Sequence, residues 1–193
     1  KSNDKGIDLR CTKKEIENFI AENPRIENYA FFCALKKEND DTPWYLWEDG
    51  LKFRKEKVLD KYKKKLYDEI LFYAFLQYEF FTLWQSLKEY ANKNGVSIIG
   101  DMPIYLSHDS ADVWASPHLF SLDENMHLRH CAGVPPDYFC KDGQKWGNPL
   151  YNWDKLKKEN YSLWCDRLGY SLKMYDSVRI DHFRAFSAYW SIP

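Results

Sequence analysis

Two short apolar segments of this 193-residue chain each follow a helical stretch, and each ends in an aspartate. The first, residues 96–99, runs into Gly100 and Asp101, and the second, residues 178–180, runs into Asp181. An apolar run of this length between a helix and a polar residue is typical of a buried strand, and a helix joining two such strands is typical of a parallel sheet. The pattern therefore predicts an α/β fold with Asp101 and Asp181 on the same rim of a sheet or barrel.

The first ninety or so residues carry helical patterns. Thr12 and Glu15 are spaced as a capping box, in which the Thr hydroxyl and the Glu carboxylate satisfy free amide donors at a helix start. This predicts a helix over residues 13–22, which Pro24 separates from a second helix over 26–37. Residues 56–94 contain neither Gly nor Pro and predict further helix. Between 70 and 84 this helix is apolar nearly all round, so we expect it to be enclosed on several sides.

Residues 102–151 are rich in Pro, Gly, Asp and Trp, and we expect them to be irregular except for a short helical turn near 111–114. An irregular stretch of this length in a compact domain usually has a function. Another helix is expected over 154–168, with Asp154 as its N-cap. We therefore expect a helical subdomain, or barrel elaboration, over 1–94. Over 95–193 we expect a partial barrel with two strands, a long substrate loop and a crossover helix.

The composition is that of a cytoplasmic globular protein. Lys and Arg number 28 and Asp and Glu number 29, so no net field favours nucleic acid or an anionic membrane as a partner. The five cysteines are scattered, without CxxC spacing, and we expect them to be reduced thiols. The longest apolar run, residues 70–76, is far too short to span a bilayer, and no leader sequence follows Lys1.

Asp101 and Asp181 on one rim indicate either glycoside chemistry or a metal site. Arg179 and Arg184 flank Asp181, and a nearby guanidinium favours the ionised form of a carboxylate, which a nucleophile needs. The alternative interpretation is a structural ion pair between Asp181 and these arginines.

The histidines do not predict a metal site, because none has HExxH or other tight ligand spacing. We therefore expect neither a metal nor a cofactor. His182, next to Asp181, is expected to bind a sugar hydroxyl or to make a structural hydrogen bond. The five histidines are His108, His118, His127, His130 and His182.

Two segments rich in proline and aromatic residues, 133–139 and 144–151, predict a stiffened loop. The prolines restrict the backbone, while Tyr138, Phe139 and Trp146 offer flat faces on which sugar rings can stack. Such a loop suits an extended sugar chain. The alternative is a loop that only covers the core.

Six segments together carry a resemblance to a known family. They are Gly100-Asp-Met-Pro-Ile-Tyr105, Asp109-Ser-Ala-Asp-Val-Trp114, Leu122-Asp-Glu-Asn125, Ala132-Gly-Val-Pro-Pro-Asp-Tyr-Phe139, Trp146-Gly-Asn-Pro-Leu-Tyr-Asn-Trp153 and Val178-Arg-Ile-Asp-His-Phe-Arg184. With these segments the chain resembles the 4-α-glucanotransferase (amylomaltase) family, glycoside hydrolase family 77. The similarity extends over nearly the whole chain, which corresponds to something under half of a family member.

The resemblance implies an α-amylase-type (β/α)8 TIM barrel, of which this chain forms a part together with a helical subdomain. It implies that Asp181 is the catalytic nucleophile. Arg179 would hold this carboxylate and the donor sugar, and Asp101 would be a strand-end acid of the donor site. The remaining implied substrate residues are Asp137, Tyr138 and Phe139 on a loop over the active site, and Trp146 and Asn148 on its continuation.

The implied reaction is a retaining transfer of 1,4-α-glucan segments between malto-oligosaccharides, without a cofactor. The resemblance places the acid/base Glu and a third catalytic Asp outside this chain, so we expect the 193 residues alone to be inactive. Ala185 and Ser187 depart from the usual family residues, with small expected effects. Self-association of the fragment through open sheet edges is a possible consequence.

An alternative function belongs to a different class. If these residues form a natural gene product, the chain would be a non-catalytic glucan-binding or partner-binding module. The coding sequence beyond Pro193 distinguishes the two, because only the enzyme requires a further strand-end Glu.

Overall fold

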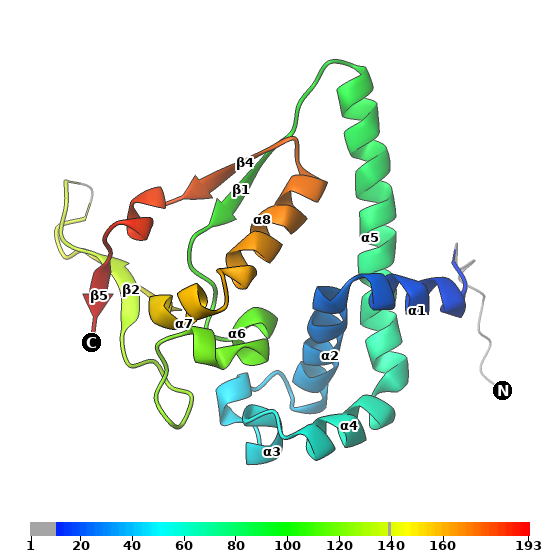
Figure 1. Ribbon diagram of the computed structural model, residues 1–193, viewed down its shortest axis with the longest axis horizontal. Helices are drawn as coiled ribbons and strands as arrows, with labels where there is room; N and C mark the ends of the chain where they lie inside the picture. Colours follow the sequence, from blue (N-terminus) through cyan, green and yellow to red (C-terminus); the bar gives the residue numbers. More distant parts are fainter. Residues whose placement is uncertain (1–10, 139) are drawn as a thin grey trace.

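The structure is a computed structural model, and it describes residues 11–138 and 140–193. Helices from the first half of the chain stand beside a region that contains both sheets (Figure 1). The chain has an α/β fold with two partial sheets, as the alternating pattern predicts. Phe139, one of the predicted site residues, lies outside the described residues.

The first two helices form where the sequence predicts them. Helix α1 spans Lys13–Glu22, and its capping box is confirmed: the Glu15 N–H donates to Thr12 Oγ1 at 3.3 Å, and the Thr12 N–H donates to Glu15 Oε2 at 2.6 Å. Helix α2 spans Pro24–Glu38 and begins with its proline, whose missing N–H removes no helical hydrogen bond at this position.

The expected helical stretch over 56–94 is two helices, α4 (Glu56–Lys65) and α5 (Tyr67–Lys93). The chain bends at Leu66, whose side chain is buried, directly after three lysines that favour the end of a helix. Two shorter elements precede α4: the 3-10 helix η1 (Trp44–Leu46) and helix α3 (Asp49–Lys52).

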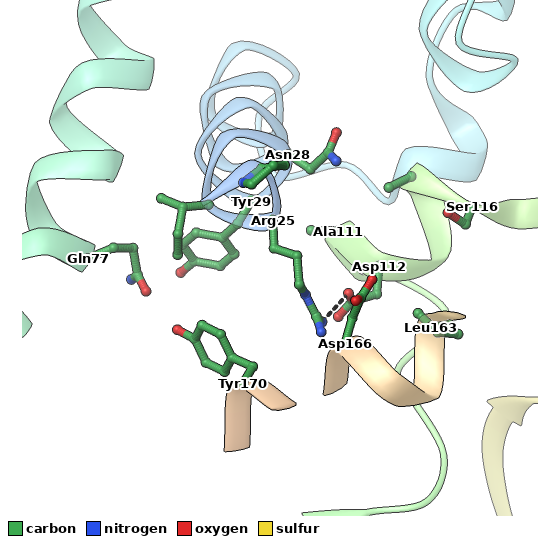
Figure 2. A pocket seen from close by; sticks show the side chains of 13 residues that line it. Arg25, Asn28, Tyr29, Gln77, Ala111, Asp112, Ser116, Leu163, Asp166 and Tyr170 are labelled. Carbon is green, nitrogen blue, oxygen red and sulfur yellow. Dashed lines mark hydrogen bonds and ion pairs between the residues drawn. The ribbon is translucent and has the colours of Figure 1, made fainter. Parts of the chain in front are cut away.

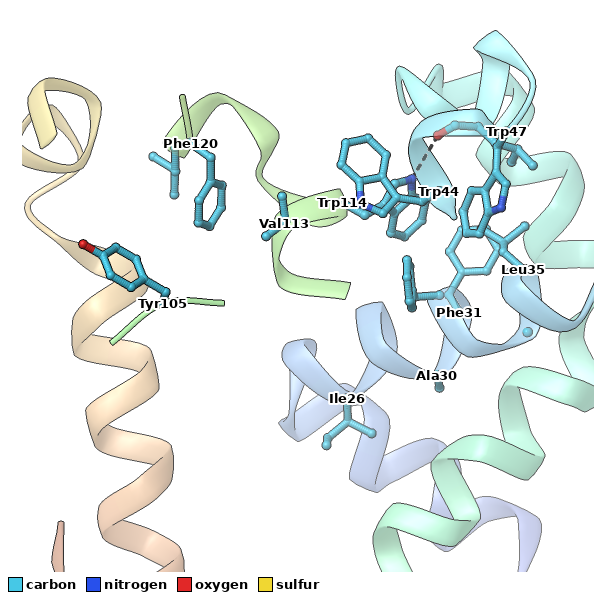
Figure 3. Packing of buried hydrophobic residues seen from close by; sticks show 14 of the residues in the cluster. Ile26, Ala30, Phe31, Leu35, Trp44, Trp47, Tyr105, Val113, Trp114 and Phe120 are labelled. Carbon is cyan, nitrogen blue, oxygen red and sulfur yellow. Dashed lines mark hydrogen bonds between the residues drawn. The ribbon is translucent and has the colours of Figure 1, made fainter. Parts of the chain in front are cut away.

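Aromatic rings form the centre of the hydrophobic core, between α2, η1 and helix α6 (Ala111–Ala115) (Figure 3). Trp44 and Trp114 are completely buried. Their indole N–H groups donate to the carbonyl oxygens of His108, at 2.6 Å, and Leu51, at 3.0 Å. The ring of Phe31 meets that of Trp114 edge-on at 5.7 Å. The same buried cluster therefore includes the helices and the first part of the long connection after residue 102.

The two predicted strands pair in parallel, as β1 (Ile99–Pro103) and β4 (Ser177–Asp181). The predicted position of the first strand, residues 96–99, is wrong by several residues, because β1 begins only at Ile99 and continues past Asp101. The Asp176 carboxylate explains this start: it accepts hydrogen bonds from the backbone of Ile98 and the side chain of Asn92, both at 2.8 Å. These bonds hold the entry to β1 against the entry to β4.

The helix expected over 154–168 is also two helices, α7 (Trp153–Lys158) and α8 (Ser162–Met174). Asn160 and Tyr161 separate them with left-handed φ angles of 52° and 56°. The N-cap of α7 is Asn152, whose side-chain oxygen accepts from the Lys155 N–H, and not Asp154. Helix α8 contacts both β1 and β4, as a crossover between parallel strands does.

The segment 102–151 has more structure than the sequence predicts. It contains the predicted turn as α6, then η2 (Pro117–Leu119) and the strands β2 (Cys131–Val134) and β3 (Gln144–Pro149). After β4, η3 (Phe183–Phe186) leads to β5 (Trp190–Ile192). Strands β2, β3 and β5 form an antiparallel sheet in the order β3-β2-β5.

The prediction that the apolar part of α5 is enclosed on several sides is wrong in this structure. Six large apolar side chains recur every three or four residues along α5, and each is at least 43% exposed. One side of α5 packs on α1, α2 and α8, so these residues occupy a different side. They are Phe72, Leu76, Phe80, Leu83, Leu87 and Tyr90, named here the α5 apolar face. Within the described ranges, no helix has the length and apolarity that a membrane span requires.

Candidate active site

The parallel pairing of β1 and β4 brings three charged side chains together. Asp101 lies opposite Arg179, and Asp181 follows two residues later on the same side of β4. Arg179 Nε donates to Asp101 Oδ1 at 3.0 Å, and Arg179 Nη2 donates to Asp101 Oδ2. Arg179 Nη2 also lies 3.7 Å from Asp181 Oδ1. One guanidinium group therefore links two carboxylates on the exposed face of the strand pair.

The electrostatics of this trio are asymmetric. The hydrogen bonds from Arg179 to Asp101, followed by the charge of Asp101, raise the pKa of Arg179 above its ordinary value. Arg179 thus stays fully charged, and its fork-shaped donor set is directed mainly at Asp101. Asp181 lies at the edge of this interaction with its carboxylate exposed, which leaves it open to an incoming molecule.

The prediction that both arginines flank Asp181 holds only for Arg179. Arg184 forms no ion pair with Asp181 in the part of the chain that the structure describes. The reason is the backbone at His182, whose left-handed φ of 52° ends the strand and starts η3. This turn carries Arg184 away from the strand pair and toward the loop after β2.

Two of the predicted loop residues are placed by β3. Trp146 is 37% exposed, and its ring meets the His182 ring edge-on with centroids 5.1 Å apart. The loop therefore lies beside the end of β4, although the two are far apart in the sequence. Asn148 has a different environment: its side-chain N–H donates to the Leu106 carbonyl at 2.9 Å, so this amide positions β3.

The tip of the loop carries Asp137 and Tyr138. Asp137 Oδ1 accepts from the Cys140 N–H at 2.7 Å, and the Asp137 N–H donates to the Cys140 carbonyl, so the tip is a tight local turn. Tyr138 is 97% exposed. Asp137 also lines a hollow of about 420 Å³ together with His182.

Two residues in the wall of this hollow were missed by the sequence-based site prediction. They are Tyr189 and Trp190, which follow Asp181 in the sequence. No spacing rule connects them to a site, because only the pairing of β5 with β2 brings them to the Asp137 loop. The one sequence feature that could have indicated these residues is the series of aromatic residues that follows the strand-end Asp181. Arg184, which the sequence analysis placed beside Asp181, lines the same hollow because of the turn at His182.

A second hollow, of about 360 Å³, lies where α2, α5, α6 and α8 meet (Figure 2). None of the predicted site residues lines it. Arg25 Nη2 donates to Asp112 Oδ1 at 2.6 Å across this hollow and joins α2 to α6. Burial raises the pKa of Tyr29 and of Tyr170, whose rings lie one above the other in Figure 2, to about 12 each. We interpret this region as a structural joint between helices.

Metal ligands do not gather anywhere in the described ranges. Among residues 11–138 and 140–193, no three His, Cys, Asp or Glu side chains come close enough together to hold a metal ion.

Comparisons with known proteins agree over nearly the whole chain. The sequence profile of glycoside hydrolase family 77, described as 4-alpha-glucanotransferase, matches residues 3–193. The 4-alpha-glucanotransferase of Thermus thermophilus is 47% identical over 98% of this chain, and that of Clostridium butyricum is 46% identical over 95%. In both cases the match covers 39% of the relative, so the chain spans about two fifths of the length of these curated proteins.

A solved structure is similar as well. The amylomaltase from Streptococcus agalactiae, in complex with acarbose, superposes with a TM-score of 0.88 at 43% sequence identity. The match covers 93% of this chain and 36% of that chain. Sequence and fold thus agree, and the chain belongs to glycoside hydrolase family 77, the family of the 4-alpha-glucanotransferases.

Proposed function

We propose that the full-length protein containing this chain is a 4-α-glucanotransferase with Asp181 as its nucleophile. It transfers 1,4-α-glucan segments between malto-oligosaccharides. The observation that carries this proposal is the pair of parallel strands on which Arg179 links Asp101 to an exposed Asp181. The names of the relatives, and the acarbose bound to the similar amylomaltase, support an oligosaccharide as the substrate.

In the first step an Asp181 carboxylate oxygen attacks the anomeric carbon of a bound glucan. The bond from this carbon to the glycosidic oxygen breaks, and a carboxylic acid protonates the departing oxygen. The product is a glucanyl ester of Asp181 and a shortened sugar. Arg179 supports this step because its Nη2, 3.7 Å from Asp181 Oδ1, orients the carboxylate for attack.

In the second step a sugar 4-hydroxyl replaces water as the acceptor. The carboxylate left by the general acid takes the hydroxyl proton, the sugar oxygen bonds to the anomeric carbon, and Asp181 leaves as a carboxylate. Retention of the α-configuration follows from the two displacements.

The roles of the other residues follow from their positions. Asp101, held by two hydrogen bonds from Arg179, orients the guanidinium toward Asp181 and faces the donor sugar. Trp146 and His182 form an edge-to-face pair beside the strand end and contact the glucan, as do Asp137, Tyr138 and Phe139 on the loop. Asn148 holds β3 in position through the hydrogen bond that its side chain donates to the Leu106 carbonyl.

We further propose that β1 and β4 are neighbouring strands of a closed (β/α)8 barrel, with residues 1–94 as a helical subdomain attached to it. Crossover helix α8 between parallel strands supports this architecture. The relatives are more than twice as long as the match, so we assign the acid/base carboxyl to the part of the protein outside this sequence. The inactivity of the 193 residues alone, and their cytoplasmic location, stay predictions.

Incubation of the full-length protein with maltotriose tests the proposed function. The expected products are glucose and chains longer than maltotriose, whereas glucose without longer chains would indicate a hydrolase. The variant Asp181→Asn should reduce turnover by at least about 1,000-fold, since an amide cannot form the glucanyl ester. Asp166→Asn, an exposed carboxylate on α8, is the matched control and should retain wild-type turnover. Full activity of Asp181→Asn would disprove the assignment.

The alternative function, a non-catalytic glucan-binding or partner-binding module, is supported by one observation. The predicted aromatic loop lies within this sequence with a hollow beside it, whereas the proposed acid/base lies outside. Maltose binding to the 193-residue chain, together with a coding sequence that stops after Pro193, would favour the module.

A further inference from the structure

The joint between α2, α5, α6 and α8 contains a hollow that the surrounding side chains do not fill (Figure 2). Its volume of about 360 Å³ lies within the range of about 300–1,000 Å³ that small-molecule sites occupy. A single water molecule takes only about 30 Å³, so the hollow has room for a much larger ligand. Helix α2 packs on α5 and on α6, and α5 packs on α8, so the fold holds the walls of the hollow in place.

The ion pair between Arg25 and Asp112 forms one end of the hollow. Arg25 Nη2 donates to Asp112 Oδ1 at 2.6 Å, and both side chains line the hollow. Arg25 Nη1 is buried and has no hydrogen-bond partner in the part of the chain that the structure describes. An unsatisfied charged donor is costly, so an oxygen acceptor placed against this guanidinium group is favourable. Because Asp112 already balances the charge of Arg25, this acceptor does not need to be an anion.

Further polar groups of the hollow are not used by the protein itself. The side chains of Asn28, Gln77 and Tyr170 line the hollow, and among the described residues they make no hydrogen bond. Figure 2 shows the hydroxyl groups of Tyr29 and Tyr170 directed toward the side on which Gln77 lies, with Arg25 on the other side of the two rings. The hollow therefore has polar groups at two ends and aromatic rings between them.

This distribution of polar and aromatic groups matches a pyranose ring. A pyranose has two apolar faces, which aromatic rings can cover, and hydroxyl groups around its edge. A ring held by Tyr29 and Tyr170 can place hydroxyl oxygens at Arg25 on one edge and at Gln77 on the other. An anion would approach the Asp112 carboxylate, and a purely apolar ligand would leave the guanidinium and the amide without partners. The hollow thus fits a neutral polyhydroxylated ring best.

We propose that this hollow is a binding site for a neutral monosaccharide, separate from the strand pair that carries Asp181. No described residue of the proposed active site lines it. The inference goes beyond the proposed function and does not depend on it, because it assigns binding and no catalytic step to these residues. A sugar in the hollow contacts α2, α5 and α8 together. Since only the folded protein forms the hollow, the bound sugar also stabilises the joint between these helices.

Calorimetric titration of the full-length protein with glucose tests the proposal. Acarbose, which the similar amylomaltase binds, is present in excess so that the site at Asp181 is occupied. We expect one glucose to bind per chain with a Kd on the order of 1 mM. The absence of glucose binding, or glucose binding that acarbose abolishes, would overturn the proposal.

Two mild variants locate the bound glucose. Gln77→Ala removes the amide, and Tyr170→Phe removes only the hydroxyl and keeps the ring that packs edge-on against Phe81 at 5.3 Å. Each should weaken glucose binding by about fivefold, the effect of one lost hydrogen bond. Gln85→Ala is the matched control on the same helix. The Gln85 side chain donates to the Lys173 carbonyl and does not line the hollow, so glucose affinity should stay at the wild-type value.

Two further results would contradict the assignment. Wild-type glucose affinity in both Gln77→Ala and Tyr170→Phe would place the sugar elsewhere, and thermal unfolding without glucose shows that each variant is folded. Inorganic phosphate serves as the anion probe and should bind more weakly than glucose. Phosphate binding that is tighter than glucose binding would identify an anion site at Arg25 instead of a sugar site.

Discussion

Arg179 is the residue on which the charged trio depends. Its two donors to Asp101 lie side by side, and one of them also approaches Asp181. A lysine keeps the charge but offers no fork, so it cannot serve both carboxylates in this geometry. We therefore expect Arg179→Lys to lower the kcat of the full-length protein by roughly 10- to 100-fold.

The stability of the same variant should barely change, because all three side chains are exposed and exposed ion pairs contribute little. Steady-state kinetics together with thermal unfolding separates the two effects. Arg129→Lys, an exposed arginine on the loop before β2, is the control and should match the wild type in both. Wild-type kcat in Arg179→Lys would show that the fork has no role.

His108 should make the stability of the protein depend on pH. Its ring stacks on Tyr45 at 4.2 Å, and its Nε2 lies 2.9 Å from the Met126 carbonyl oxygen. Burial lowers the pKa of His108, although the hydrogen bond to Met126 opposes this. Below a pH of about 6.5 the unfolded chain takes up a proton that the folded state resists, so this contribution to stability decreases as the pH falls.

The variant His108→Gln isolates that effect, since glutamine does not titrate and still has N–H groups to donate to Met126. We expect the free energy of unfolding in urea to fall less between pH 7.5 and pH 5 in His108→Gln than in the wild type. His118→Gln changes an exposed histidine and should leave the wild-type pH dependence in place. The same fall in His108→Gln and wild type would contradict this account.

The positions of individual side chains could be predicted from the sequence where they depend on residues only a few positions away. Asp181 and Arg179 are two residues apart on one strand, so their shared side follows from the two-residue period of a strand. Arg184 lies beyond the strand, and the left-handed backbone of His182, which redirects it, has no clear sequence signal. Tyr189 and Trp190 reach the Asp137 loop only through pairing between strands distant in the sequence.

Helices and strands, too, were predictable from the sequence where their causes are local, and were not where they depend on distant residues. Helices α1 and α2 form where the capping box and Pro24 predict them, since these signals act within one turn. Strands β2 and β3 have no alternating pattern: β2 reads Cys-Ala-Gly-Val, and β3 contains both Gly147 and Pro149. They form because they pair with each other across the Asp137 loop, and because β2 also pairs with β5, which is distant in the sequence.

Arg167 connects α8 to the end of β1, and its replacement should weaken this contact between elements. It is 5% exposed, and its guanidinium donates to the carbonyls of Ile104 and Pro103, at 3.0 and 2.5 Å, and to the Tyr151 hydroxyl at 2.8 Å. Arg167→Met removes all three hydrogen bonds, and the Ile104 carbonyl then accepts only from the Tyr151 hydroxyl, at 2.7 Å. We expect a loss of about 3 kcal/mol in the free energy of unfolding.

Urea unfolding measures this loss, and Lys173→Met on the same helix is the control. Lys173 is exposed, so its substitution should change stability by less than about 0.5 kcal/mol. Equal stability of Arg167→Met and the wild type would mean that removing a buried charge compensates fully for the lost hydrogen bonds.

At the scale of the whole molecule, the α5 apolar face bears on the barrel proposal. Helix α8 packs across β1 and β4, and α5 precedes β1 in the chain as α8 precedes β4. In a closed barrel, α5 would in the same way cover β1 and a further strand, and its exposed apolar side chains would be buried there. We therefore expect the part of the full-length protein outside this sequence to cover the α5 apolar face.

Cysteine labelling tests this expectation with little disturbance of the fold. Leu83→Cys lies on the α5 apolar face, and Thr82→Cys is exposed about 100° away around the helix. In the full-length protein a thiol reagent should modify Leu83→Cys at least about tenfold more slowly than Thr82→Cys. In the 193-residue chain the two rates should be similar.

The masses of digested peptides distinguish the label on the introduced cysteine from label on the five native cysteines. Equal labelling rates in the full-length protein would contradict the barrel proposal. Protection that disappears on dilution would instead indicate a second copy of the protein on this face.

The sequence was sufficient to predict the α/β class and the parallel strand pair, since both follow from local alternation of helix and strand. It could not predict how much of α5 is covered, because burial depends on the whole assembled protein. The 193 residues span about two fifths of the length of the curated relatives, and we expect the remaining part to cover the α5 apolar face.

The most direct test of the central claim is to trap the covalent intermediate on Asp181. The full-length protein is incubated with a slowly reacting fluorinated maltosyl fluoride, digested, and examined by mass spectrometry. We expect one peptide, containing Asp181, whose mass increases by that of the fluorinated maltosyl group. The label should be absent from Asp181→Asn. A label on any other carboxylate, with Asp181 unmodified and the protein active, would contradict the assignment of Asp181 as the nucleophile.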